Sequence, residues 1–209
     1  MKGILFKPWK IKAIADGGYD RDWQTRRVIK PQPEHFHYTS DAQFPCTAQG
    51  EQFKPRYQVG EVVYIKETLF RHPYLNEAGY VLDETPVFIN QTIGDCLKWR
   101  WSRDILSAMF MPLETARYFI KITDVRAERT KDITPEDCLL EGIIFAGGCY
   151  WTAEDGIAFD TPQAAYFALY DSINGKGSHE KNWDFKYSFV KVDKPLDVNW
   201  LCYECHSNK

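Results

Sequence analysis

Alternating and β-branched apolar residues predict strands in six parts of the chain. The clearest alternation lies near the middle of the sequence, where Tyr118, Ile120 and Ile122 mark one face of a strand. Another strong run follows the turn at Val59-Gly60 and is rich in β-branched residues. The predicted strands span residues 2–6, 24–29, 62–70, 80–90, 116–126 and 185–192.

Apolar spacing and capping signals predict three helices. Apolar residues three and four positions apart, followed by two glycines, predict a helix over residues 8–16. Two further helices begin where a capping Thr precedes a Pro, at Thr134 and Thr161. Gly142 and Gly175 end them. Strands and helices do not alternate regularly, which disfavours a doubly wound parallel sheet.

The predicted fold class is therefore α+β, built on a small, mostly antiparallel β-barrel decorated by helices. The chain has 209 residues and a mass of 24.4 kDa, a size typical of one domain. We expect a single domain over residues 1–195, with a long Pro-, Gln- and His-rich loop at about residues 30–57. Residues 196–209 are expected to form a C-terminal tail.

Composition and charge exclude several classes of protein. Aromatic residues make up 15% of the chain, which is enough to build a core and argues against disorder. No apolar run approaches the roughly 20 residues of a membrane-spanning helix, so no membrane partner is expected. A net charge of -3 argues against nonspecific coating of duplex nucleic acid. Residues 1–60 nevertheless carry a net +4 and the rest a net -7, so a local anionic partner fits the basic portion, and chance scatter of surface charge is the alternative.

The six cysteines are interpreted as reduced thiols in the cytoplasm, because the N-terminal residues do not resemble a signal peptide. Cys202, Cys205 and His206 match a haem attachment motif, but that modification requires export. The same three residues supply half of a zinc site, with a fourth ligand from Cys46, His35 or His37. An unliganded tail is the simpler interpretation, so neither a metal nor another cofactor is predicted.

Six motifs occur in a fixed order along the chain: residues 3–6 (GILF), 24–31 (QTRRVIKP), 60–68 (GEVVYIKET), 122–126 (ITDVR), the helix at 133–142, and 170–175 (YDSING). The same order is found in phage and prophage ASCH-like proteins of the PUA-like superfamily, which the chain resembles over residues 3–192. The resemblance implies a compact β-barrel with a cleft beside the first helix, and binding of RNA or a modified nucleotide.

A relative in that superfamily is an amidohydrolase that acts on acetylated cytidine through a Lys, a Thr and a Glu. Most of the phage group has Lys and Thr in the stretch after the first helix. Here these positions hold Asp22 and Trp23, so the chain departs from the family pattern where the catalytic Lys would lie.

The polar candidates for ligand binding are Gln24, Arg26 and Arg27, beside the hydroxyl of Thr25. Guanidinium groups suit phosphate because each presents a planar fork of donors. Neighbouring side chains of a strand face opposite ways, so at most one of the two arginines faces a given cleft directly. The structural alternative is a salt bridge, for which Glu67 is one candidate partner.

Lys66 and Glu67 lie near the end of the strand predicted over residues 62–70. An inward-facing Glu on a strand is costly unless it is paired. Glu67 therefore either pairs with an Arg or acts as a base on a bound ligand, with Thr25 and Lys66 positioning the substrate.

Three tryptophans, Trp23, Trp99 and Trp101, lie in irregular segments beside charged residues. Each is either a lid over the core or a platform on which a base stacks. The sequence Trp99-Arg100-Trp101 joins stacking to charge and suits single-stranded nucleic acid.

Three functional hypotheses follow. The first is a binding module for RNA or a modified nucleotide. The second is a hydrolase of a modified nucleoside that uses Glu67, Thr25 and Lys66. The third is a phage regulatory protein that binds a host protein through its acidic surface. The sequence does not indicate an oligomeric state.

Overall fold

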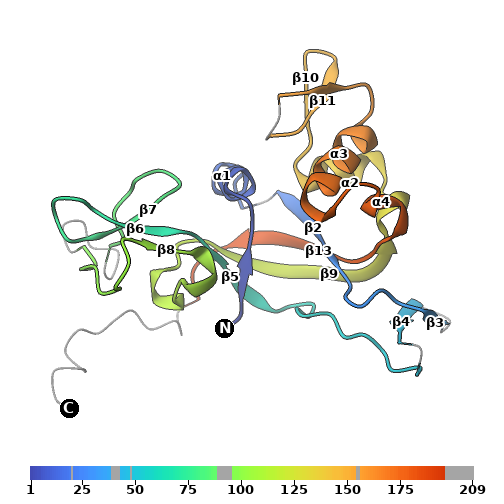
Figure 1. Ribbon diagram of the computed structural model, residues 1–209, viewed down its shortest axis with the longest axis horizontal. Helices are drawn as coiled ribbons and strands as arrows, with labels where there is room; N and C mark the ends of the chain where they lie inside the picture. The colour runs from blue at the N-terminus through green and yellow to red at the C-terminus, as the bar shows by residue number, and fades with distance from the viewer. Residues whose placement is uncertain (20, 39–42, 48, 89–95, 154–155, 196–209) are drawn as a thin grey trace. The chain divides into compact units, whose positions relative to one another are not determined.

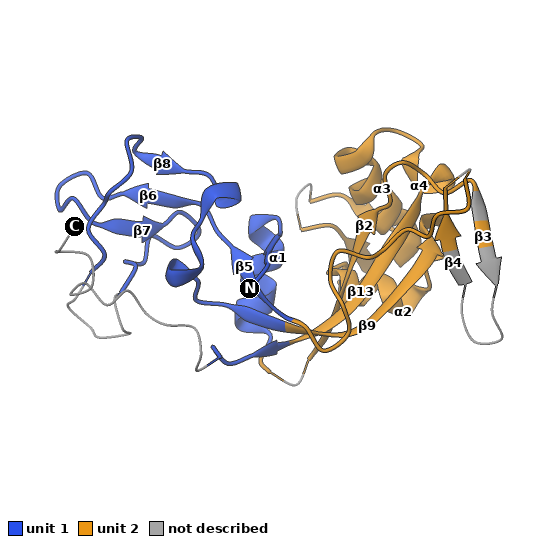
Figure 2. Ribbon diagram, turned by 90° about the horizontal axis from the view of Figure 1, so that it is seen from below, with its two compact units in different colours: residues 1–17, 62–120, 191–209 blue, residues 18–61, 121–190 orange. Residues whose placement is uncertain are grey.

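The structure is a computed structural model that describes residues 1–19, 21–38, 43–47, 49–88, 96–153 and 156–195 (Figure 1). Contacts within the chain define two compact units (Figure 2). Unit 1 comprises residues 1–17, 62–120 and 191–209, and unit 2 comprises residues 18–61 and 121–190. The predicted tail, residues 196–209, lies outside the described residues.

Unit 1 is built on short strands and one helix, α1. Its first strand, β1, pairs in parallel with β5, and Gly3 lies opposite Tyr64. A Cβ at Gly3 would lie 2.5 Å from Lys66 Cε and 2.7 Å from Tyr64 Cζ, so a larger residue there would require both side chains to shift. A second sheet has the strand order β7-β6-β8. The elements are β1 (Gly3–Leu5), α1 (Pro8–Asp16), β5 (Val62–Lys66), β6 (Leu69–Arg71), β7 (Ala78–Tyr80), β8 (Ile105–Leu106) and the 3₁₀ turns Ala108–Phe110 and Leu113–Thr115.

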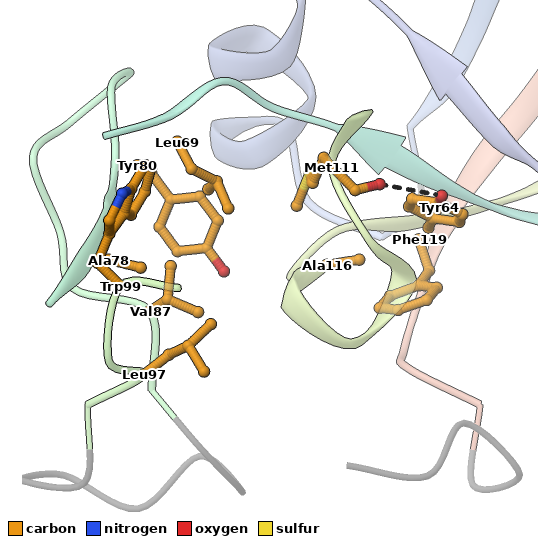
Figure 3. Packing of buried hydrophobic residues seen from close by; sticks show 10 residues of the cluster. All are labelled: Tyr64, Leu69, Ala78, Tyr80, Val87, Leu97, Trp99, Met111, Ala116 and Phe119. Carbon is orange, nitrogen blue, oxygen red and sulfur yellow. Dashed lines mark hydrogen bonds between the residues drawn. The ribbon is translucent and has the colours of Figure 1, made fainter. Parts of the chain in front are cut away.

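A hydrophobic cluster fills unit 1 beneath these strands (Figure 3). Trp99 is part of this cluster, and the Tyr64 hydroxyl donates a hydrogen bond across it to the Met111 carbonyl at 3.3 Å. The cluster consists of Tyr64, Leu69, Ala78, Tyr80, Val87, Leu97, Trp99, Met111, Ala116 and Phe119.

Unit 2 contains a sheet in which β9, β13 and β2 lie in that order, covered by helices. Strand β13 pairs antiparallel with β2 over seven residue pairs, from Asp184↔Val28 to Val190↔Asp22. The strands of unit 2 are β2 (Asp22–Val28), β3 (His35–Tyr38), β4 (Gln43–Cys46), β9 (Phe119–Arg129), β10 (Ile144–Ala146), β11 (Cys149–Trp151), β12 (Ala158–Phe159) and β13 (Trp183–Val192). Its helices are α2 (Pro135–Glu141), α3 (Pro162–Asn174), α4 (Ser178–Lys181) and the 3₁₀ turn Thr130–Asp132. The first two residues of β9 and the last two of β13 belong to unit 1.

The three predicted helices are confirmed as α1, α2 and α3. The Thr134 hydroxyl accepts a hydrogen bond from the Asp137 amide at 3.2 Å, and Thr161 caps α3 in the same way. Gly142 ends α2 with a φ of 108°, a conformation that other residues rarely adopt. These signals are local in sequence, which is why they predicted the helix ends well.

The strand predictions are confirmed in part. The predicted strand over 62–70 is broken in the structure, because the Glu67 amide donates to the Met111 sulfur instead of joining a ladder. The strand predicted over 80–90 is wrong for residues 81–88, because the chain turns after Tyr80 and Glu84 adopts a φ of 59°. Residues 89 and 90 lie outside the described residues. The expected loop at 30–57 contains the β3–β4 hairpin, and the sheet of β10, β11 and β12 was not predicted.

The α+β class is confirmed, and the strand pairing is mixed, since β1 and β5 are parallel whereas β13 and β2 are antiparallel. Within the described residues no closed barrel is detected. None of the described helices is both long and apolar enough to span a membrane.

Candidate functional site

The predicted site residues divide between the two units. Five lie on β2 in unit 2, and the other four lie in unit 1. The unit 2 residues are Trp23, Gln24, Thr25, Arg26 and Arg27, and those of unit 1 are Lys66, Glu67, Trp99 and Trp101.

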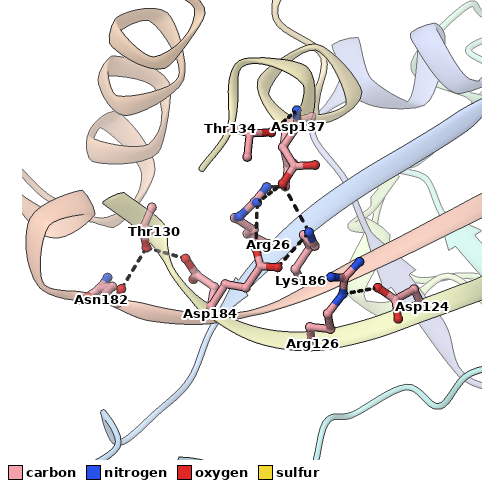
Figure 4. Close-up of polar contacts among 11 residues, drawn as sticks. Arg26, Asp124, Arg126, Thr130, Thr134, Asp137, Asn182, Asp184 and Lys186 are labelled. Carbon is pink, nitrogen blue, oxygen red and sulfur yellow. Dashed lines mark hydrogen bonds and ion pairs between the residues drawn. The ribbon is translucent and has the colours of Figure 1, made fainter. Parts of the chain in front are cut away.

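Arg26 is the centre of a buried ionic cluster in unit 2 (Figure 4). Its side chain has 0% of its surface exposed. One terminal nitrogen, Nη2, lies 2.8 Å from Asp137 Oδ2 and 3.2 Å from Glu128 Oε2, and Nη1 lies 3.2 Å from Glu141 Oε1. Strand β9 supplies Glu128 and helix α2 supplies the other two carboxylates.

Lys186 joins this cluster from the neighbouring strand. It lies directly opposite Arg26 in the β13–β2 pairing, and its Nζ lies 2.8 Å from Glu128 Oε1 and 3.2 Å from Asp137 Oδ2. Burial alone would raise the pKa of Asp137, but hydrogen bonding and charge from Arg26 outweigh it, so that pKa is lowered. Two cations thus neutralise most of the charge of three carboxylates. The anionic partners of the Arg26 guanidinium are therefore carboxylates of the protein itself.

The other β2 candidates are also enclosed. Thr25 and Trp23 are buried, and Arg21 covers the Trp23 ring with its guanidinium carbon 4.2 Å from the ring centroid. Burial lowers the pKa of Arg27, and electrostatic interactions with Tyr57, Glu141 and Tyr187 only partly oppose that effect. None of these side chains is presented to solvent as a ready platform for a base or a phosphate.

Glu67 is paired with Arg117, a residue that sequence reasoning did not single out. The pair is bidentate, with Arg117 Nε 2.9 Å from Glu67 Oε2 and Nη2 2.7 Å from Oε1. Arg117 also donates through Nη1 to Asp83 and Thr85, each at 2.8 Å. Burial raises the pKa of Glu67, while the hydrogen bonds and charge of Arg117 act in the opposite direction.

This arrangement matches the structural interpretation of Glu67 as a paired residue. Both carboxylate oxygens accept from Arg117, whose guanidinium carbon lies 3.8 Å from the centroid of the Tyr80 ring. The neighbouring Lys66 donates to the Met109 carbonyl at 2.6 Å. In the sequence, Arg117 is one charged residue at the start of the strand predicted over residues 116–126. Nothing near it in the sequence points to Glu67 as its partner.

The two remaining tryptophans differ in exposure. Trp99 is buried in the core of unit 1, whereas Trp101 is only partly buried and meets Trp99 edge-on at 4.8 Å between ring centroids. Trp101 borders a groove of about 760 Å³. The groove is lined by Trp101, Ser102, Arg103, Asp104, Ile105, Leu106, Ser107 and Phe110, and we call it the Trp101 groove.

Aromatic and cationic groups meet at the Trp101 groove. Phe110 is 70% exposed at its rim. Arg103 is exposed, and no ion pair or hydrogen bond to it is found in the described part of the chain. Other cations nearby are engaged: Arg100 pairs with Glu114, and Arg71 lies 3.6 Å from Asp104. Among the described residues, the groove therefore offers the Arg103 guanidinium beside the exposed Phe110 ring and the partly buried Trp101 ring, which Arg100 also approaches, at 5.2 Å from its centroid.

The described ranges show no metal site, and one of their free cysteines, Cys138, is buried. They contain no group of three or more His, Cys, Asp or Glu side chains arranged to hold a metal ion. Burial raises the pKa of the Cys138 thiol to about 12, which keeps it protonated and unreactive. Cys202, Cys205 and His206 lie outside the described residues.

Comparison with known proteins returned no matching family model, no matching curated protein and no matching solved structure.

Proposed function

We propose that the protein binds single-stranded RNA or a modified nucleotide through the Trp101 groove. The observation that carries this proposal is the convergence of Trp101, Phe110 and the uncommitted Arg103 on one groove. A base that stacks on an aromatic ring gains about 1–3 kcal/mol, and a guanidinium beside it suits the adjoining phosphate.

The dimensions and composition of the groove support a ligand of this class. Its volume of about 760 Å³ lies within the range of about 300–1,000 Å³ that is usual for small-molecule sites. Ile105 and Leu106 add apolar surface beside the rings, and Ser102 and Ser107 add hydroxyls. A mainly apolar lining with a few polar groups is usual for sites that bind small molecules, and it can accept the flat face of a base.

The proposal keeps the ligand class that the resemblance to phage ASCH-like proteins implies, and changes the residues that bind it. Arg26, which the sequence suggested as a phosphate ligand, is held by three carboxylates. The PUA-like barrel and the phage origin belong to the same proposal and rest on the six sequence motifs. The cytoplasmic location belongs to it as well and rests on the interpretation of the cysteines as reduced thiols.

The test is fluorescence anisotropy with a fluorescein-labelled twelve-nucleotide RNA at low and moderate salt. We expect Trp101→Ala and Phe110→Ala each to weaken binding about tenfold, since each removes a stacking surface. Arg103→Ala should weaken binding and make it less sensitive to salt, because one phosphate contact is lost.

Two control variants test whether weaker RNA binding is specific to substitutions in the Trp101 groove. Tyr74→Ala removes an aromatic side chain of unit 1 that is 90% exposed and outside the groove, and Arg126→Ala removes an exposed arginine of unit 2. Both should bind RNA like the wild type. If Trp101→Ala and Phe110→Ala also bind like the wild type, the proposed site is wrong.

A further inference from the structure

The β10–β11 hairpin of unit 2 presents apolar side chains to solvent. All three residues of β10 are exposed, and Ile144 and Phe145 have 50% and 59% of their surface accessible. The two-residue turn Gly147-Gly148 has positive φ at both positions, as a tight hairpin requires. Figure 1 shows the hairpin extending beyond α2 and α3 in this unit.

Strand β10 is an edge strand of its sheet. The strand order is β10-β11-β12, so β11 lies in the middle and β10 pairs with β11 alone among the described strands. It contains neither the Lys nor the Pro with which edge strands commonly discourage pairing. The edge is therefore open to another strand.

The register shows which backbone groups face outward. Ala146 and Cys149 flank the two-residue turn and form a hydrogen-bonded pair, so the next pair, Phe145 and Tyr150, is not hydrogen-bonded. The Phe145 and Tyr150 rings lie close together, 4.9 Å between centroids, as side chains of such pairs do. The N–H and C=O of Phe145 consequently point away from β11, toward the open edge.

The chain segment that contains β10 has acidic residues and no basic ones. Residues 133–175 contain seven acidic residues and no Lys, Arg or His. Asp137 and Glu141 are paired with Arg26, and Asp171 lies beside His179, so they add little outward charge. Glu136 at α2 and Asp160 just before α3 are exposed. Exposed carboxylates in a segment without basic residues repel nucleic acid and attract a cationic polypeptide.

We propose that the open edge of β10 binds an extended, cationic segment of a partner protein by strand addition. Main-chain hydrogen bonds to Phe145 supply register, its ring and Ile144 supply apolar contact, and the acidic segment supplies charge complementarity. This surface lies in unit 2, and the inference does not depend on the nucleotide site proposed in unit 1.

The experiment uses the full chain and a labelled peptide, Lys-Val-Lys-Val-Lys-Val-Lys, measured by anisotropy against its counterpart with Glu in place of each Lys. We expect the cationic peptide to bind at least tenfold more tightly. Phe145→Ala should weaken binding several-fold by removing the ring. Phe145→Pro should weaken it about tenfold further, since proline also removes the outward N–H, which the β10–β11 pairing does not use.

Two variants that add the same positive charge test whether the peptide binds at the β10 edge or to acidic residues elsewhere on unit 2. Phe145→Lys and Ile173→Lys add the same charge to side chains of similar exposure, 59% and 51%, but only the first lies on β10. Peptide binding should be lost in Phe145→Lys and retained in Ile173→Lys, with far-UV circular dichroism showing that both fold. Equal losses in the two variants, or equal binding by Phe145→Ala and Phe145→Pro, would overturn strand addition.

Light scattering distinguishes a partner protein from a second copy of the chain. A dimer that Phe145→Lys dissociates, together with no peptide binding by the wild type, would assign the edge to self-association and overturn the proposal.

Discussion

Among the described carboxyl groups of unit 2, Asp184 on β13 is the most enclosed, with no exposed surface. It accepts hydrogen bonds from the hydroxyls of Thr130 and Tyr170. Burial raises its pKa from 3.8 to about 6, and these two hydrogen bonds only partly oppose that effect. A carboxyl with a higher pKa in the folded state than in the unfolded state binds a proton more tightly when folded.

Stability should therefore depend on pH through Asp184. The stabilisation that comes from protonated Asp184 is fully present below about pH 4 and is lost as the pH rises through about 6. The difference between the folded and unfolded pKa of Asp184 corresponds to roughly 3 kcal/mol of free energy of unfolding. We expect the difference in free energy of unfolding between wild type and Asp184→Asn to fall by up to about 3 kcal/mol between pH 4 and pH 7. Urea unfolding across this range measures it.

Asp160→Asn is the control, because it removes an exposed carboxyl from the same unit. Its difference from the wild type should stay within about 0.5 kcal/mol at every pH. A difference for Asp184→Asn that is as flat as this would show that Asp184 titrates alike in both states.

Single residues also show how far sequence reasoning reaches at the candidate site. Arg26 was predicted to bind phosphate, with a structural salt bridge as the alternative, and in the structure it forms ion pairs with three carboxylates of the protein. They lie 102, 111 and 115 residues later in the chain, a separation at which one sequence gives no sign of contact. Glu67 was expected to pair with an arginine or to act as a base, and Arg117, 50 residues away, proved to be a partner.

At the scale of elements, the structure agrees with the prediction where the determining residues are close together in the sequence, and differs where they are far apart. The helices α1, α2 and α3 have the predicted bounds because their caps and stops lie within a few residues. The sheet of β10, β11 and β12 has strands of two or three residues, too short for alternation to be detected. The break between β5 and β6 depends on the Met111 sulfur, which comes from a distant turn.

The cap of α2 affects more than the helix, since α2 carries two carboxylates of the Arg26 cluster. Thr134→Ala should lower the free energy of unfolding by about 1 kcal/mol, because the Asp137 amide loses its acceptor. Thr134→Ser keeps the hydroxyl and should cost only a few tenths of a kcal/mol. Urea unfolding of the two variants measures the contribution of the cap to stability. If Thr134→Ala and Thr134→Ser are equally stable, the Thr134 hydroxyl does not stabilise α2.

At the scale of the whole molecule, neither unit is a continuous piece of chain. The chain passes between them four times, and both β9 and β13 contribute residues to each. Strand β13 provides the seven pairs that hold β2. The two units should therefore depend on the same C-terminal strand.

A fragment that ends at Asn182 tests this dependence. Without β13, the fragment loses the partner of β2 and the Lys186 charge of the buried cluster, so we expect it not to fold. Far-UV circular dichroism and resistance to limited proteolysis compare it with the full chain. A fragment with native-like spectra and resistance would show that β13 is dispensable.

The Arg26 cluster has a consequence for how the chain avoids folding errors. A slip of β2 by one residue along β13 would turn Arg26 to the other face of the sheet. If the slip brings Thr25 opposite Lys186, Glu141 loses its ion pair with Arg26, and Lys186 alone remains beside Glu128 and Asp137, at a cost of several kcal/mol. These five charged groups come together only in the native pairing of β2 with β13. The cluster therefore favours the native strand register over one in which Arg26 faces the opposite side of the sheet.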